Sequence, residues 1–138
     1  MTVKPGIIES IFARYKKEFR HTLLWKNANK STQSLLLKRV KLLVDESPIL
    51  YYSPSTENGW LLTTENLFIF GDNATRTMRL ADIESVELKK LWEETETKIE
   101  LSSLQLFSKS ELINLETEKL SWPVIFKIFH FIVRKLHE

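Results

Sequence analysis

The sequence of 138 residues contains no cysteine, only three glycines and no apolar run long enough to cross a membrane. Without cysteine there is no disulfide framework and no thiol nucleophile. Three glycines leave no glycine-rich phosphate loop, and neither G-x-x-x-x-G-K nor G-x-G-x-x-G occurs. A membrane span needs about 20 apolar residues, and the first residues do not resemble a secretory signal. We therefore expect a cytoplasmic protein.

Groups that usually carry out catalysis are also scarce. The three histidines, His21, His130 and His137, lie far apart and show no metal-ligand spacing. The cluster of glutamates at residues 93–96 is expected to be solvated charge in a turn, and no G-x-S-x-G motif is present. The sequence therefore predicts neither an enzyme nor a metal or other cofactor.

Charge is divided unevenly along the chain, although the net charge is only +2. Residues 1–46 contain ten Lys/Arg and four Asp/Glu, which gives +6, whereas residues 47–118 contain six and thirteen, which gives −7. Residues 119–138 contain four and one, which gives +3. Either the basic and acidic parts neutralise each other within one molecule, or the N-terminal segment presents a basic face outward.

The first predicted helix starts near Pro5, which suits a first helical turn. From Ile7 to Phe19, apolar residues recur at spacings of three and four, which indicates an amphipathic helix. Its other side is basic and comprises Arg14, Lys16, Lys17 and Arg20.

A second helix is predicted after Asn27-Ala28-Asn29, with Ser31 or Thr32 as its cap. Its expected buried stripe comprises Leu35, Leu36, Val40, Leu43 and Val44. We expect the two helices to form a basic helical hairpin, residues 1–46, that packs on the main domain.

The remaining residues, 47–138, predict about seven short strands and a C-terminal helix. Apolar residues lie on both faces of the predicted hairpin over Gly59–Phe70, which favours a closed or strongly curved sheet. Further strands are expected around Ile49–Tyr52, Arg76–Leu80, Val86–Trp92, Ile99–Leu106 and Leu112–Leu115. The helix predicted from Leu120 to His137 has a wide apolar face that must be largely buried. The predicted fold class is α+β, a seven-stranded antiparallel barrel or sandwich capped by the C-terminal helix.

Three phrases of the sequence resemble the bacterial pleckstrin-homology and GRAM-like domains. They are Gly59-Trp60-Leu61-Leu62-Thr63-Thr64, Leu67-Phe68-Ile69-Phe70 and Met78-Arg79-Leu80-Ala81-Asp82-Ile83-Glu84-Ser85-Val86. The resemblance covers roughly residues 48–138 and implies a barrel closed at one end by the last helix. It implies binding of lipid, peptide or protein without catalysis. Members that bind phosphoinositides carry bases in the loop between the first two strands, whereas Ser53–Asn58 has none and contains Glu57.

Together these features predict a non-catalytic interaction module that binds a protein partner. The residues expected at the contact are Arg14, Lys16, Lys17, Arg20, Trp25 and Lys26. The alternative is peripheral association with an anionic membrane surface, at the inner face of the membrane, through the basic N-terminal helix. Nucleic acid is the weakest candidate because nothing supplies base readout, and a homodimer remains open.

Overall fold

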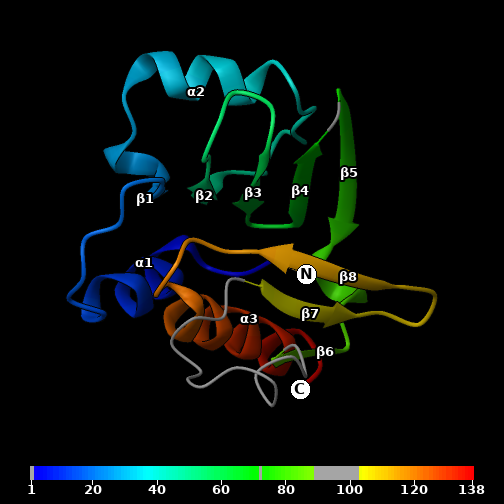
Figure 1. The fold of residues 1–138 in the computed structure, drawn as a ribbon. Coiled ribbons are helices and arrows are strands. Elements are labelled where there is room, and N and C mark those ends of the chain that lie inside the picture. Colours follow the sequence, from blue (N-terminus) through cyan, green and yellow to red (C-terminus); the bar gives the residue numbers. More distant parts are fainter. Residues whose placement is uncertain (1, 72, 89–102) are drawn as a thin grey trace.

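The computed structural model describes residues 2–71, 73–88 and 103–138, which form two antiparallel sheets and three α-helices (Figure 1). The five-stranded sheet has the order β1 (Thr22–Leu24), β2 (Pro48–Tyr52), β3 (Gly59–Thr63), β4 (Asn66–Gly71), β5 (Ala74–Arg79). The three-stranded sheet has the order β6 (Ser85–Leu88), β7 (Ser103–Phe107), β8 (Leu112–Glu116). The helices are α1 (Pro5–Arg14), α2 (Lys30–Leu37) and α3 (Trp122–Leu136), with 3-10 turns at η1 (Trp25–Asn27) and η2 (Leu80–Asp82). The predicted α+β class is confirmed.

Strands β3 and β4 form the expected hairpin, with Gly59 opposite Phe70 and Leu62 opposite Leu67. One face of the five-stranded sheet contributes Leu50, Leu62 and Leu67 to the main core. The opposite face carries a second, smaller apolar cluster comprising Leu36, Tyr51, Leu61, Phe68 and Phe70. Leu36 belongs to α2, which lies over this outer face in Figure 1. We call these residues the outer cluster.

The predicted closed barrel is wrong for the described strands, which form two separate sheets. Apolar residues on both faces of β3 and β4 had suggested closure. The structure shows a different cause, because one face packs on the core and the other packs under α2. Where the chain passes from β5 to β6, it turns through η2 and changes sheet instead of pairing the two strands.

Helix α3 packs in the core, as its apolar face predicted. Phe129 is fully buried and meets the Trp60 ring edge-to-face at 6.5 Å between centroids. Trp60 also donates its indole N–H to the Glu116 carbonyl at 2.7 Å, which joins β3 to the end of β8. Pro123 lies in the first turn as expected. Ser121 makes no side-chain cap; its hydroxyl instead donates to the Glu118 carbonyl at 2.7 Å.

The predicted N-terminal helical hairpin is wrong. Residues 22–24 form β1, which lies between the two helices in the chain and pairs with β2, with Leu24 opposite Leu50. Leu24 is buried in the main core, so the gain from burying it favours a strand here. Helix α1 ends at Arg14, so Lys16, Lys17 and Arg20 follow the helix, and α1 packs against α3.

Helix α2 begins one residue before the predicted cap. Asn29 caps it by accepting a hydrogen bond from the Thr32 N–H at 2.8 Å. Of the stripe that was expected to be buried, only Leu36 is fully so; Leu35, Leu43 and Val44 are 53%, 61% and 100% exposed. The helix ends at Leu37, and the chain beyond it follows another constraint: the buried Glu46 carboxylate accepts hydrogen bonds from the Leu43 N–H, Thr63 and Asn66.

Part of the predicted strand pattern, Leu91-Trp92 and Ile99 to Leu101, lies outside the described residues. Among the helices that the structure describes, none combines the length and apolar character needed to cross a bilayer.

Candidate functional site

Helices α1 and α3 lie side by side (Figure 1). A groove of about 300 Å³ is lined by residues of both helices. On its core side, α3 buries Val124, Ile125, Ile128 and Ile132. That leaves Lys127, His130 and Arg134, at helical spacings of three and four, on the side facing the groove. The full lining comprises Ile11, Arg14, Tyr15, Val124, Phe126, Lys127, His130, Phe131 and Arg134. We call it the α1–α3 groove.

Charge in the α1–α3 groove has one sign. Among the residues that the structure describes, Arg14, Lys127 and Arg134 line it, and no carboxylate does. None of the three forms a salt bridge with another described residue. The ion pairs found in the described ranges are Lys26–Glu9, Arg76–Glu111 and Lys135–Glu138. Like charges that lack a counter-ion repel one another, so an anion in the groove would be attracted to all three.

Aromatic side chains give the groove an apolar floor that is held in place. Phe126 and Phe131 are partly buried against the core, and the His130 ring stacks on Phe126 with 6.0 Å between centroids. The Tyr15 hydroxyl donates to the Leu120 carbonyl at 3.1 Å, and its ring stacks on Phe19 at 5.9 Å. These contacts fix the end of α1 to the residue preceding α3's first turn.

The residues predicted from sequence fall into two groups. Arg14 lies in the groove, and Lys16 and Lys17 follow it as exposed residues; the Lys17 ammonium lies 5.9 Å from the centre of the Tyr15 ring. Arg20 is exposed, and its backbone N–H donates to the Glu118 carboxylate at 2.7 Å. The residues of this first group therefore lie within one continuous basic segment, residues 14–20.

Trp25 and Lys26 form the second group and have contacts elsewhere. Trp25 is partly buried beside the outer cluster, and its ring meets Tyr51 edge-to-face at 6.2 Å. The Lys26 Nζ lies 3.9 Å from the Glu9 Oε1 of α1. Trp25 therefore has a packing role that its position between Leu24 and Lys26 did not reveal.

Sequence reasoning missed the contribution of α3. No contact residue was predicted on this helix, and His130 was considered only for metal-ligand spacing. The spacing of three and four residues between Lys127, His130 and Arg134 places them on one stripe of the helix, and this could have been recognised from the sequence. What the sequence did not reveal is that this stripe faces Arg14, about 115 residues earlier in the chain.

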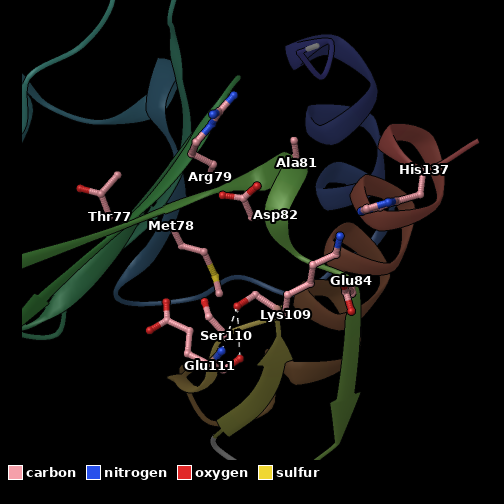
Figure 2. Close-up of a pocket in the computed structure, with 11 residues that line it drawn as sticks. Thr77, Met78, Arg79, Ala81, Asp82, Glu84, Lys109, Ser110, Glu111 and His137 are labelled. Carbon is pink, nitrogen blue, oxygen red and sulfur yellow. Dashed lines mark hydrogen bonds between the residues drawn. The ribbon is translucent and has the colours of Figure 1, made fainter.

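A second hollow of about 480 Å³ lies between β5, η2, the β7–β8 turn and the end of α3 (Figure 2). Its charges are mixed: Figure 2 shows Asp82 between Arg79 and Lys109, and Glu84 and Glu111 also line the hollow. Among the described residues, the lining has two bases and three acids, so the hollow lacks the single sign of charge that the α1–α3 groove has.

The hollow of Figure 2 contains serine, histidine and aspartate, but they do not form a catalytic set. The His137 Nε2 hydrogen bonds to the Ile83 carbonyl at 2.8 Å. The Ser108 hydroxyl donates to the Glu111 carbonyl at 3.3 Å and accepts from the Glu111 N–H at 3.2 Å. A nucleophile, its base and an orienting acid need to be hydrogen bonded to one another, whereas Ser108 and His137 are hydrogen bonded to backbone groups.

The loop between β2 and β3, residues 53–58, has no base of its own, but α2 brings Lys38 and Arg39 against it. The Arg39 guanidinium donates to the carbonyls of Glu57 at 2.9 Å and of Thr56 and Ala74 at 3.4 Å. It also lies 4.4 Å from the centre of the Phe70 ring. Arg39 therefore holds the loop and the end of α2 on the sheet. Lys38 is the exposed basic residue beside the loop.

Searches among protein-family models, curated proteins and solved structures found no match to this chain.

Proposed function

We propose that the chain is a non-catalytic interaction module that binds a protein partner at the α1–α3 groove. The observation that carries the proposal is the set of three cations, Arg14, Lys127 and Arg134, that line the groove and form no salt bridge with any described carboxylate. Protein interfaces favour arginine and aromatic side chains around a recessed apolar centre. The α1–α3 groove has both.

The proposed relation to pleckstrin-homology-like domains is supported by the order of elements alone. Strands β2 to β5 lie in one sheet, β6 to β8 lie in a second sheet, and α3 follows them and packs in the core. We propose that residues 48–138 are such a domain, to which α1, β1 and α2 are added. The groove then combines an added element, α1, with the helix that closes the domain.

The membrane alternative is less well supported by the geometry. On the basic N-terminal helix, Ile8 is fully buried, and Phe12 and Tyr15 pack against the core. Insertion into a bilayer interface needs protruding apolar side chains. The apolar residues that line the groove are buried or half-buried, whereas its three cations are exposed, which suits a ligand side chain that enters the groove.

Charge reversal tests the proposal. The chain would be used to capture partners from a lysate of its native host, in parallel with the variant Arg14→Glu/Lys127→Glu and the control Lys38→Glu/Lys135→Glu. The control makes the same change in net charge and also alters one residue of α3, but neither of its residues lines the groove. We expect the wild type and the control to retain the same partner and the groove variant to lose it.

A partner retained equally by all three proteins would contradict the groove as its site. Recovery of no partner by any of them would contradict the interaction module itself. Because all four substituted side chains are exposed, we expect substitutions there to change stability by no more than about 0.5 kcal/mol each. Thermal unfolding of each variant checks that the loss of the partner is not a loss of folding.

A further inference from the structure

The α1–α3 groove continues into a second, more open hollow along α1. This hollow, about 710 Å³, is lined by Lys4, Gly6, Ile7, Ser10, Ile11, Arg14 and Phe131. It shares Ile11, Arg14 and Phe131 with the groove. The two therefore form one continuous surface across α1 and α3, which we call the basic channel.

Charge along the whole basic channel stays positive. Lys4 and Arg14 mark the two ends of α1, and Lys127 and Arg134 stand on the α3 side. No carboxylate of residues 2–71, 73–88 or 103–138 lines either hollow. Apolar side chains line both hollows: Ile7, which is 40% exposed, lies in the hollow along α1, Phe126 lies in the groove, and Phe131 lines both.

We propose that the basic channel binds a linear acidic segment of a partner protein, in extended form, with one apolar anchor residue seated in the α1–α3 groove. This rests on the proposed interaction function and specifies the chemistry of its ligand. Carboxylates of the segment meet Lys4, Arg14, Lys127 and Arg134, and the anchor contacts Phe126 and Phe131.

Dimensions favour an extended segment. Helix α1 has 10 residues, which at 1.5 Å each span about 15 Å, and about five extended residues at roughly 3.3 Å each cover that length. A ligand helix is about 10 Å across, whereas the groove of about 300 Å³ is at the lower end of the range for small ligands. It has room for a side chain and not for a helix.

Shape favours a protein segment over a membrane. The apolar residues of the groove are buried or half-buried and its cations are exposed, so a side chain that projects from an extended chain reaches them more readily than a flat bilayer surface does. Burial of that side chain and complementary charges on both sides of it give affinity and register together.

Selection from a phage-displayed library of random peptides tests the inference. The immobilised wild-type chain is expected to enrich peptides that combine several Asp/Glu with one aromatic or large aliphatic residue. For the enriched peptides, Arg14→Glu/Lys127→Glu should lower the affinity about tenfold or more, with little change for Lys38→Glu/Lys135→Glu. The affinity should also fall as salt is added.

Amide chemical shifts of the labelled wild-type chain provide a readout that needs no variant. Addition of an enriched peptide should shift the amides of α1 and α3 and leave those of the β7–β8 turn unchanged.

Enrichment of basic or neutral peptides, or of acidic peptides that bind the groove variant and the control equally, would overturn the acidic segment. So would enrichment of no peptide. Each of these results leaves the interaction function standing if a whole partner is still lost on Arg14→Glu/Lys127→Glu in the lysate experiment. Binding to phosphatidylserine-containing vesicles but not to phosphatidylcholine vesicles, in competition with the peptide, would overturn the protein segment in favour of a membrane.

Discussion

The two sheets of this protein differ in how many of their faces are covered. In the five-stranded sheet, β2 and β3 bury side chains on both faces; one face joins the main core and the other joins the outer cluster under α2. In the three-stranded sheet, β8 alternates strictly between exposed and buried residues. The first sheet is the middle layer of three, and the second is an outer layer.

This difference explains where the sequence pattern was read correctly and where it was not. Alternation in β8 indicates one buried face, and the structure agrees. Apolar residues on both faces, as in β3, indicate that both faces are covered, without saying by what. The predicted closed barrel was one solution to that pattern, and a covering helix is the other.

We expect the largest loss of stability from a substitution in the core that both sheets share. Phe129 is fully buried, in contact with Trp60 of β3, in the same core as Leu104 and Leu106 of β7. Phe129→Ala should lower the free energy of unfolding by about 3–5 kcal/mol, because burial is lost and a cavity remains. Denaturant titration measures it. A loss below about 1 kcal/mol would show that the two sheets do not depend on a common core.

We expect substitutions on the outer faces of the two sheets to differ in how much stability they remove. Leu61 is fully buried in the outer cluster, so Leu61→Ala should cost about 2–5 kcal/mol. Gln105 is on the outer face of β7, where Asn114, at 3.4 Å, is the partner that its amide has among the described residues, so Gln105→Thr should change stability by about 0.5 kcal/mol or less. Equal losses in denaturant titrations would refute the distinction between a covered and an uncovered face.

Removal of the side chain that holds α2 in place should have an intermediate effect. Arg39→Ala removes donors to the carbonyls of Thr56, Glu57 and Ala74 and the contact with Phe70. We expect a loss of about 1–2 kcal/mol, since the site is exposed and water can replace the bonds in part. Hydrogen exchange should show faster opening in α2 than in β7. Uniform acceleration across both would mean that α2 is not a separate layer in stability.

The smallest effect concerns alkaline pH. Burial raises the pKa of Tyr51 above 10.0, and burial followed by the charges of Glu116 and Glu118 raises the pKa of Tyr52. The folded state therefore favours the neutral phenols. This stabilisation is complete below the unfolded pKa and is lost as the pH rises through the raised folded pKa. Tyr51→Phe should make the decline in unfolding free energy above about pH 10 shallower. An unchanged decline would show that Tyr51 does not titrate under α2.

Local pattern predicted the strands of the β3–β4 hairpin and the C-terminal helix because each is determined by nearby residues. Period-two alternation and the apolar stripe of α3 both survive in the structure. The fate of Thr22–Leu24 did not follow from local pattern. Three residues cannot show a period, and only pairing with β2, with Leu24 in the core, makes them a strand.

The candidate site was predicted in part for the same reason. Arg14, Lys16 and Lys17 were identifiable from a basic segment, which is a local property. Lys127 and Arg134 join the site only because α1 packs against α3, and that packing is decided by the fold as a whole. Trp25 was predicted at a contact surface. Its packing partner, Tyr51, comes from another part of the chain, so the residues around Trp25 did not reveal this contact.

The contact between α1 and α3 has a consequence for biosynthesis. Tyr15 is hydrogen bonded to Leu120, 105 positions later, so part of the surface on which α1 packs is absent until the last helix has been synthesised. During translation this part of the packing would be completed in a late step. A nascent or truncated chain that lacks α3 would therefore lack the α3 side of the α1–α3 groove.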